Sequence, residues 1–481
     1  MENKFYITTP IYYPTAKPHL GTAYTTIAAD ILARWNILLG KEVFFLTGTD
    51  EHGQKLEEAA KNANKDPKEY VDILVEDFKN AWDKLNIRFS GFIRTTDKKH
   101  ERNVKEIINK ILVKGDIYKG KYNGLYCVPC ETYWTEKDLS EGKCPSCLRE
   151  VKEIEEEAYF FKLSNYQDKL LEVYKKNPRF ILPESKRNEM INRVREGLKD
   201  VSFTRSKFKW GVEFPIDPNF VLWVWPDALT NYLSGVDWPS GENFNKFWPA
   251  DTHLIGKDIL FFHAVIWPAM LLSANVELPK TIFAHGWWTV NGEKMSKSKG
   301  NVVDPLNISN RYCVDTLRYF LFRETPFGQD GDFSETSLIE RHNNELANKL
   351  GNLVSRVFAL AERYGIQKCD NKLVGKLKLK EISECMESYE LDKALALIFE
   401  FIDVCNEYVQ SNKVWETKDK CVLYELVDSI KAIAILLYPF IPSSSEKIAS
   451  DLGFKIESIS QLDQPLSEIS IKKGEILFKK V

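Results

Sequence analysis

The stretch FYITTPIYYPTAKPHLGTAYTTIAADILARWNILLGKEVFFLTGTDEHG, residues 5–53, decides the fold. Residues 5–13 are rich in β-branched and aromatic side chains and predict a buried strand that ends at Pro14. Residues 42–46 predict the next strand, and residues 47–53 form the loop at its carboxyl end. Between the two strands, four apolar residues recur at helical spacing before Gly40: Ile27, Ile31, Trp35 and Leu38. A strand, a helix and a strand joined by short loops are typical of a parallel sheet covered by helices.

The same α/β pattern continues along the chain with one interruption. Asp66-Pro67 opens a further helix, and another ends at Gly115. Residues 118–224 then combine a cysteine cluster, an acidic run and short β-like pieces, which we interpret as an insertion between two halves of the sheet. The α/β pattern resumes with residues 221–225, 253–256 and 281–285, and a helix runs through Phe262 and Ile266. From about residue 345 only helical patterns remain, and Ser443 followed by Glu446 predicts a capping box at the last helix.

Length and composition limit the possible classes of protein. With 481 residues the chain is expected to form two to four domains, and its hydrophobic content of 44% is ordinary for a globular protein. A net charge of -3 means that any nucleic-acid contact must come from a local basic surface. The start has no signal-peptide pattern, and the apolar stretch 264–276 is short and interrupted by Pro268. We therefore expect a cytoplasmic protein without a membrane segment, whose nine cysteines are thiols or metal ligands rather than disulfides.

Four of the cysteines have the spacing of a metal site. Cys127 and Cys130 form one Cys-x2-Cys pair, and Cys144 and Cys147 form a second pair, separated from the first by 13 residues. Two such pairs can present four thiolates to one zinc ion, and four protein ligands leave no open position for chemistry. We predict one structural zinc ion. The five remaining cysteines are scattered and, where they fall in helical stripes, are expected in the core: 313, 369, 385, 405 and 421.

Two distant segments could contact phosphate. Lys294-Met295-Ser296-Lys297-Ser298-Lys299-Gly300 offers ammonium and hydroxyl donors in one short loop, although a solvated basic loop has the same composition. His19 lies between a predicted strand and a predicted helix, where helix amides can hold an anion, although a lone histidine is often a packed turn residue. Together they resemble the two signature motifs of class I aminoacyl-tRNA synthetases, His-Ile/Leu-Gly-His and Lys-Met-Ser-Lys-Ser. The second motif matches throughout, whereas the first departs at Thr22, where the family has histidine.

Further stretches resemble the methionyl-tRNA synthetase family within that class. They are Thr-Thr-Pro-Ile-Tyr-Tyr (8–13), Phe-Leu-Thr-Gly-Thr-Asp-Glu-His-Gly (45–53), Gly-Lys-Asp (256–258), Phe-Phe-His-Ala-Val-Ile-Trp-Pro (261–268) and His-Gly-Trp (285–287). The likeness runs over nearly the whole chain. It implies an enzyme that activates L-methionine with ATP to methionyl-adenylate, releasing pyrophosphate, and then transfers methionine to tRNA(Met), releasing AMP.

The resemblance also implies an amino-acid pocket. Asp50 would pair with the substrate ammonium, and Arg205 with Asp50 or the substrate carboxylate. The pocket walls would be mostly aromatic, which suits a polarizable thioether: Ile11, Tyr13, Trp225, Tyr232, His263 and Trp267. The alternative is that these aromatics are ordinary core, above all Trp267. Pro226 also departs from the family pattern, which usually has an aliphatic or aromatic residue at this position.

For ATP, which is expected to bind with Mg²⁺, the resemblance implies a phosphate cradle of His19 and the amides near Gly21. Gly256 and Asp258 would lie near the ribose. Lys297 and Lys294 would contact the triphosphate, so the residues carried over as catalytic are His19, Lys294 and Lys297. Thr22 would donate one hydroxyl hydrogen bond in place of the missing imidazole.

The helical part resembles the anticodon-binding bundle of the family. Asn352 and Arg356 are four residues apart, hence on one helix face, and Trp415 matches the tryptophan on which a base stacks. The alternative is a surface pair and a core tryptophan. The chain ends soon after this bundle, so we expect a monomer.

The expected architecture is therefore α/β followed by α. A Rossmann-type parallel-sheet catalytic domain (1–117 and 225–344, the latter with the Lys-rich loop and a stem-contact region) is split by a connective insertion with a zinc knuckle (118–224). A helical anticodon-binding domain follows (345–481). Two rival classes remain at this point: a nucleotidylyltransferase of related fold, and a non-catalytic RNA-binding protein built on a zinc knuckle.

Overall fold

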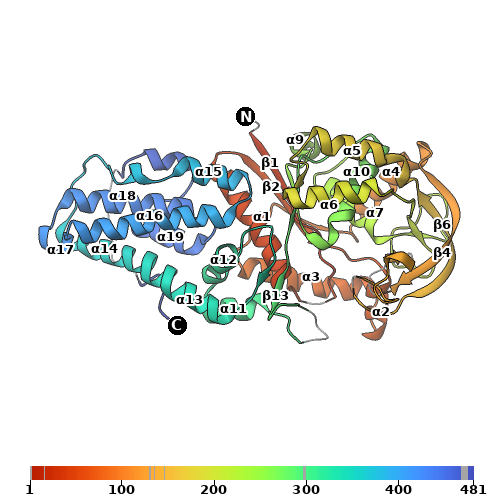
Figure 1. The fold of residues 1–481 in the computed structure, drawn as a ribbon, viewed down its shortest axis with the longest axis horizontal. Coiled ribbons are helices and arrows are strands. Elements are labelled where there is room, and N and C mark those ends of the chain that lie inside the picture. The colour runs from red at the N-terminus through yellow and green to blue at the C-terminus, as the bar shows by residue number, and fades with distance from the viewer. Residues whose placement is uncertain are drawn as a thin grey trace.

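The structure is a computed structural model that describes residues 3–15, 17–128, 132–134, 136–145, 147–295, 300–466 and 475–481. Figure 1 shows an elongated molecule with an α/β lobe on one side and a helical lobe on the other. Helix α1 (Leu20–Leu38) lies between the two lobes, and the strands β4 and β6 lie at the end opposite the helical lobe. The expected division into an α/β part and an all-helical part is confirmed.

A six-stranded parallel sheet forms the centre of the α/β lobe. Its order is β3-β2-β1-β11-β12-β7, and every pairing is parallel. The strands are β1 (Lys4–Thr8), β2 (Glu42–Thr49), β3 (Gly91–Arg94), β7 (Ile181–Leu182), β11 (Thr252–Gly256) and β12 (Ile282–His285). From β1 the chain proceeds to β2 on one side, and β11 lies on the other, so the strand order reverses between β1 and β11. In such sheets ligands bind beyond the carboxyl ends of the strands at this reversal.

The helices that flank the sheet begin and end where their sequences predict. Ile27, Ile31, Trp35 and Leu38 of α1 are all buried, and Gly40 after it has a φ of 79°, which a glycine adopts readily. Asp66 caps α3 (Pro67–Lys84) by accepting a hydrogen bond from the Lys68 amide. The other helices of this lobe are α2 (Gln54–Asn62), α4 (Lys98–Val113), α5 (Gln167–Lys176), α6 (Glu184–Arg195), α7 (Val224–Leu229), α8 (Asn231–Ser234), α9 (Glu242–Phe247) and α10 (Trp267–Ala274).

Two predicted strands differ from the structure. The first ends at Thr8 rather than near Pro14, because Pro10 has no amide hydrogen to continue the ladder; Tyr12 then forms an isolated bridge with Thr49. Val221–Leu222 forms β10 and pairs with β9 (Thr204–Arg205) in a separate antiparallel sheet, not in the central one. Trp225 is consequently on helix α7.

The predicted insertion is only partly a separate unit. It begins with a long antiparallel pair, β4 (Ile117–Cys127) and β6 (Lys152–Phe161), in a sheet of order β5-β4-β6-β8 completed by β5 (Thr132–Trp134) and β8 (Val201–Ser202). However, β7, which lies inside residues 118–224, joins the central sheet beside β12. The interpretation of that whole range as an insertion outside the sheet is therefore wrong for β7, which is too short to give a sequence signal.

The segment after β12 leads to the helical lobe. β13 (Trp288–Val290) and β14 (Glu293–Lys294) form the predicted hairpin, and its turn residues Asn291 and Gly292 both have positive φ. α11 (Pro305–Tyr312), capped by Asp304, and α12 (Val314–Arg323) follow, with β15 (Gly331–Asp332) beside β13. The helices beyond are α13 (Glu335–Arg341), a π-helix His342–Gly351, α14 (Asn352–Tyr364), α15 (Leu379–Glu387), α16 (Leu391–Ser411), α17 (Val414–Thr417), α18 (Lys420–Leu437) and α19 (Pro442–Asp451).

Three details of the helical lobe were not expected. Helix α19 begins at Pro442 with Ile441 as its cap residue and no side-chain cap, so the predicted Ser443 capping box is wrong. Cys369 and Cys421 form a disulfide, which contradicts the expectation that all cysteines are thiols or metal ligands. Cys405 is buried as predicted, Cys385 is half-buried and Cys313 is exposed. No helix in the described part of the chain has the length and apolarity needed to cross a membrane.

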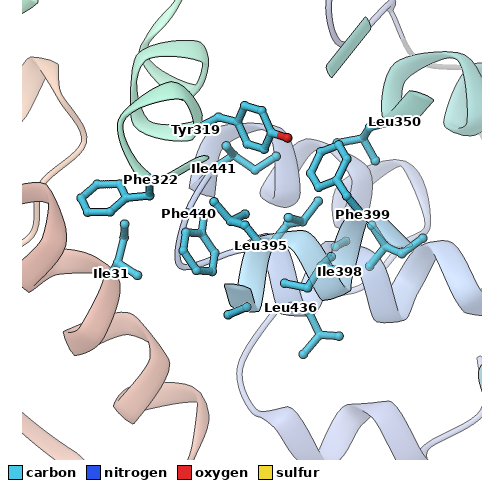
Figure 2. Packing of buried hydrophobic residues seen from close by; sticks show 14 of the residues in the cluster. Ile31, Tyr319, Phe322, Leu350, Leu395, Ile398, Phe399, Leu436, Phe440 and Ile441 are labelled. Atoms are coloured by element: carbon cyan, nitrogen blue, oxygen red, sulfur yellow. The ribbon is translucent and has the colours of Figure 1, made fainter. Parts of the chain in front are cut away.

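One hydrophobic cluster joins the two lobes. Figure 2 shows Ile31 of α1 and Phe322 of α12 beside Phe440 and Ile441 from the turn before α19. The fully buried Arg318 of α12 lies at the same junction: its guanidinium donates to Asp30 Oδ2 of α1 (2.6 Å) and to the carbonyls of Pro439 and Phe440 (both 2.9 Å). The lobes therefore share apolar packing and a buried ion pair.

Candidate active site

A cavity of about 530 Å³ opens at the strand-order reversal. Its lining comes from the segments that follow β1, β2, β11 and β12, together with α7 and α8. Eleven predicted site residues line it: Ile11, Tyr13, His19, Gly21, Thr22, Asp50, Trp225, Tyr232, Gly256, Asp258 and His263. Residues from four widely separated parts of the sequence are thus brought to one site.

His19 caps helix α1 at the mouth of this cavity. Its Nδ1 accepts hydrogen bonds from the amides of Gly21 (3.0 Å) and Thr22 (3.4 Å), so the proton of the neutral ring is on Nε2. The Thr22 hydroxyl accepts from the His19 amide (3.0 Å) and donates to the His19 carbonyl (2.7 Å), which completes a capping box. Two expectations need correction: these amides bond to the imidazole rather than forming an open cradle, and the Thr22 hydroxyl hydrogen is used within the cap.

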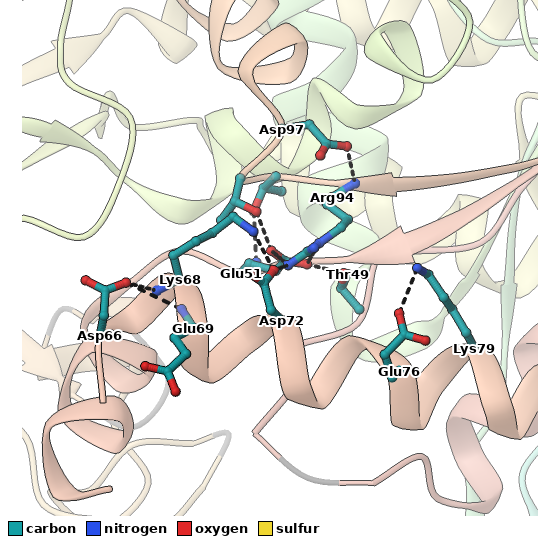
Figure 3. Close-up of polar contacts among 12 residues, drawn as sticks. Thr49, Glu51, Asp66, Lys68, Glu69, Asp72, Glu76, Lys79, Arg94 and Asp97 are labelled. Atoms are coloured by element: carbon teal, nitrogen blue, oxygen red, sulfur yellow. Dashed lines mark hydrogen bonds and ion pairs between the residues drawn. The ribbon is translucent and has the colours of Figure 1, made fainter. Parts of the chain in front are cut away.

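Three consecutive side chains of the loop after β2 point in different directions. Asp50 is buried at the cavity wall, and its amide donates to the Tyr12 carbonyl (2.9 Å). Glu51 points away and accepts two hydrogen bonds from Arg94 of β3 (2.7 and 2.8 Å); Figure 3 shows this pair with Asp72, which also contacts Arg94. His52 bonds to Asp227 of α7 (2.7 Å). The directions of the Glu51 and His52 side chains are thereby fixed by separate partners.

Aromatic rings and a neutral histidine form the opposite wall. Trp225 stacks on Phe262, with ring centroids 3.7 Å apart. His263, on the π-helix Phe262–Ile266, places Nδ1 3.0 Å from the Ile259 carbonyl and Nε2 2.7 Å from the Tyr232 hydroxyl. Since a carbonyl only accepts, Nδ1 carries the proton and Nε2 accepts from Tyr232. Burial lowers the pKa of His263 to about 4, so the imidazole is neutral at pH 7.

Two residues expected in the pocket lie elsewhere. Trp267 is fully buried behind Tyr232, with its indole nitrogen 3.3 Å from His253 Nε2, and does not line the cavity formed by the described residues. Arg205 is buried in β9, where one guanidinium nitrogen donates to Ser202 and Thr204. It is likewise absent from the cavity lining in the described part of the chain. For Trp267 the alternative of a core residue fits its position better.

The other end of the cavity is bordered by Gly256 and Asp258. A side chain at residue 256 would approach Asp258 Oδ1 to 2.7 Å, so glycine is required for the observed position of that carboxylate. Asp258 accepts a hydrogen bond from the Trp287 indole (3.2 Å). Met295, in the Lys-rich loop, also lines the cavity, whereas residues 296–299, with Lys297, are outside the described residues, as is the side chain of Lys294.

Fifteen lining residues were not among the predicted site residues, and they include Lys55, Trp287 and Met295. Lys55 is in the first turn of α2, its ammonium 5.6 Å from the Tyr13 ring centroid. Trp287 and Met295 flank the β13–β14 hairpin. The sequence contained signals for these three residues. Lys55 comes shortly after the loop 47–53, and the other two lie in or beside stretches that carry the resemblance.

The cysteine cluster is at the loops between β4 and β6. The sulfur atoms of Cys127, Cys144 and Cys147 lie within 4.8 Å of one another, with 3.5 Å between Cys127 and Cys147. Sulfur atoms bound to one tetrahedral zinc at ~2.3 Å are separated by about 3.8 Å, so the arrangement fits such an ion. Cys130, the fourth predicted ligand, lies outside the described residues. The cluster could bind a metal.

Comparison with known proteins is consistent with this geometry. A family model for "tRNA synthetases class I (M)" matches residues 5–155 and 148–358, and one for the "Anticodon-binding domain of tRNA ligase" matches residues 376–480. A methionine–tRNA ligase of Caldanaerobacter subterraneus is 46% identical, over 100% of this chain and 79% of that relative. The chain belongs to the methionyl-tRNA synthetase family. A second member, from Bacillus subtilis, is 42% identical over 100% of the chain and 78% of that relative.

Solved structures of the family have the same fold. Mycobacterium tuberculosis methionyl-tRNA synthetase in complex with methionyl-adenylate superposes with a TM-score of 0.95 at 39% identity, covering 99% of both chains. The free form of that enzyme gives a TM-score of 0.88 at 35% identity, covering 100% of this chain and 99% of that one. The present structure is thus more similar in shape to the adenylate complex than to the free form.

The three residues carried over from the anticodon domain of the family lie on adjacent helices. Asn352 and Arg356 are one turn apart on α14, and the Arg356 guanidinium lies 4.6 Å from the ring centroid of Trp415 on α17. Trp415 is 37% exposed, so its ring is not buried in the core. This exposure excludes the alternative of a core tryptophan. Of the surface pair Asn352 and Arg356, Arg356 contacts the Trp415 ring.

Proposed function

We propose that this chain is a methionine–tRNA ligase that forms methionyl-adenylate from L-methionine and ATP and then transfers methionine to tRNA(Met). The observation that carries the proposal is the cavity at the strand-order reversal in a chain of this family, lined by eleven of the residues that the family resemblance implies. A nucleotidylyltransferase does not account for the helical anticodon domain, and a non-catalytic RNA-binding protein does not account for the cavity.

The decisive experiment is ATP–pyrophosphate exchange measured over a panel of amino acids. Methionine should support exchange, because the reaction reverses adenylate formation and needs the cognate amino acid. Leucine and cysteine should support little. Exchange with leucine or cysteine but not with methionine would contradict the proposed substrate, and exchange that is independent of any amino acid would favour a nucleotidylyltransferase.

Methionine is assigned to the part of the cavity between Asp50 and the aromatic wall. Asp50 would accept hydrogen bonds from the substrate ammonium, and Trp225, Tyr232 and His263, with Ile11 and Tyr13, would surround the thioether. Because His263 is neutral, the wall adds no charge next to the apolar side chain. Arg205 and Trp267 are not assigned a direct contact. Asp50→Asn should raise the KM for methionine more than the KM for ATP.

ATP, bound with Mg²⁺, is assigned to the other part of the cavity. His19 would donate from Nε2 to a phosphate oxygen, because Nδ1 is used by the helix cap. Gly21 leaves room for the His19 ring, since a side chain there would lie 3.0 Å from it, and Gly256 and Asp258 would contact the ribose. Lys294 and Lys297 would neutralise the triphosphate as charge develops during attack of the methionine carboxylate on the α-phosphorus.

We also propose one structural zinc ion held by Cys127, Cys130, Cys144 and Cys147, and anticodon contacts from Asn352, Arg356 and Trp415. Support for zinc comes from the clustered sulfurs, and support for base stacking from the exposed Trp415 ring beside Arg356. Native mass spectrometry should show one zinc per chain, lost on treatment with a chelator. The domain ranges 1–117, 118–224, 225–344 and 345–481 are retained as proposed limits, with β7 contributed to the central sheet.

A cytoplasmic location and a monomeric state complete the proposal. Among the described residues, large exposed apolar side chains such as Ile37, Ile73 and Ile216 come from separate segments of the chain. Light scattering coupled to size exclusion should give the mass of one chain, 55.7 kDa.

A further inference from the structure

A buried carboxylate behind the cavity connects two of its walls. Asp227, which is 1% exposed, is on α7 between Trp225 and Ala228, both of which line the cavity. Its Oδ2 lies 2.7 Å from His52 Nδ1, and its Oδ1 lies 2.8 Å from His100 Nε2 of α4. The resemblance gave no role to any of these three residues.

The direction of each hydrogen bond follows from the partners. An ionised carboxylate only accepts, so His52 donates from Nδ1 and His100 donates from Nε2. His100 Nδ1 lies 3.0 Å from the hydroxyl of Ser234, which also accepts from Asn103 (3.4 Å) and therefore has its own hydrogen available for His100. Although burial alone would raise the pKa of Asp227, the two histidines lower it to about 2. The carboxylate therefore stays charged and satisfied inside the protein.

His52 connects this carboxylate to the other walls. It is two residues after Asp50, and its carbonyl accepts a hydrogen bond from the Tyr13 hydroxyl (2.6 Å). The neighbouring Gly53 amide donates to the Trp210 carbonyl (2.9 Å), which holds the loop from its other side. Through His52, then, the segment after β1, the loop after β2 and the first turn of α7 are joined directly.

From this geometry we infer that Asp227 is a positioning residue for methionine: held by His100, it binds His52 and so fixes the distance between Asp50 and the Trp225 wall. It touches no substrate. The trio lies on the loop after β2, on α4 and on α7, whereas the residues assigned to ATP lie on other elements: His19 caps α1, and Gly256 and Asp258 are at or just after the end of β11. Disruption of the trio should consequently affect methionine more than ATP. The inference rests on the assignment of this part of the cavity to methionine.

The test compares variants that keep or remove each donor. Asparagine places its amide near the position of histidine Nδ1, and glutamine near that of Nε2. His52→Asn and His100→Gln should therefore retain a donor to Asp227, whereas His52→Leu and His100→Leu cannot. Asp227→Asn gives one acceptor and one donor in place of two acceptors, so one of the two histidine N–H groups loses its partner.

In methionine-dependent pyrophosphate exchange, His52→Leu and Asp227→Asn should each raise the methionine KM on the order of tenfold while the ATP KM changes by less than about twofold. His52→Asn should restore the methionine KM to within about threefold of the original enzyme. The matched control is Asp116→Asn, another buried carboxylate, which bonds to Tyr166 and Ser273 away from the cavity. It should change neither KM.

Two outcomes would overturn the inference: equal increases in both KM values, or a loss of thermal stability or kcat with the methionine KM unchanged. Should Asp227→Asn fail to fold, the comparison of His52→Leu with His52→Asn still decides. Asp50→Asn separates the two proposals. If it leaves the methionine KM unchanged, the pocket assignment fails; if it raises that KM while the His52 and Asp227 variants do not, only the positioning role fails.

Discussion

At the scale of single residues, the sequence resemblance predicted which side chains line the cavity more accurately than it predicted their hydrogen bonds. His19 and Thr22 both line it as expected, but their hydrogen bonds to one another and to the helix amides could not be derived from the motif. The reason is that a cap depends on backbone dihedral angles at one residue, and His19 is extended with a φ of -111°. In this chain the Thr22 hydroxyl holds the main chain of His19, while the backbone amides of Gly21 and Thr22 orient the imidazole.

Thr22→Val should therefore affect both stability and ATP binding. Loss of the capping hydroxyl is expected to lower the free energy of unfolding by about 1 kcal/mol. It should also raise the KM for ATP, because the hydroxyl holds the main chain of His19, from which the ring projects. Thr22→Ser, which retains the hydroxyl, is the control and should behave like the original enzyme. Urea unfolding and exchange kinetics measure the two effects; a valine variant with unchanged ATP KM would show that the cap does not orient His19.

The neutral buried histidines predict a specific pH dependence of stability. Burial lowers the pKa of His263 to about 4 and lowers those of His253 and His285, compared with 6.5 in the unfolded chain. Between pH 6.5 and 4 the unfolded chain then binds more protons, so this contribution is complete above pH 6.5 and falls as the solution is acidified. Urea unfolding at a series of pH values should show a shallower decline for His263→Gln. An identical slope would contradict a neutral His263.

At the scale of helices and strands, long periodic segments were predictable and short or irregular ones were not. Helix α1 buries the apolar residues that its sequence indicated, and α3 begins at the predicted Asp66-Pro67. The two-residue strand β7 is too short to produce a pattern, and its place in the central sheet depends on contacts with β12. Likewise, the π-helix that carries His263 differs from an α-helix by an added residue in the turn, which hydrophobic spacing does not reveal.

The disulfide between Cys369 and Cys421 should stabilise the helical lobe. It connects the segment after α14 to the first turn of α18 across a separation of 52 residues, for which loop-closure entropy alone gives about 4 kcal/mol. A Cys369→Ser/Cys421→Ser double variant should therefore unfold at lower urea concentration, and a reducing agent should lower the stability of the original protein toward the same value. Cys385→Ser, a half-buried cysteine outside the disulfide, is the control. Insensitivity to the reducing agent would mean that the bond does not contribute.

At the scale of the whole molecule, the order of the domains followed from the sequence but their junction did not. The change from alternating strands and helices to helices alone located the helical lobe correctly. The partners of Arg318, however, include Asp30 and two carbonyls 121 and 122 residues further along the chain. A buried arginine and its acceptors give no local pattern, because main-chain carbonyls are present at every residue.

Arg318→Leu should destabilise the complete chain by about 3 kcal/mol, since removing one partner leaves the other groups of a buried ion pair uncompensated. Arg323→Leu provides a control on the same helix: its guanidinium is 3.7 Å from Glu345 and partly exposed, so its loss should cost no more than about 1 kcal/mol. Urea unfolding followed by circular dichroism measures both. Similar costs for the two variants would show that the Arg318 site does not hold the lobes together.

The shared junction also bears on how the protein is made. During synthesis Asp30 and Arg318 emerge from the ribosome well before Pro439 and Phe440, which complete the guanidinium site. Until then the faces of α1 and α12 that meet the turn before α19 have no cover. The nascent α/β lobe therefore presents an apolar surface of the kind that ribosome-associated chaperones shield, until the turn before α19 has been synthesised.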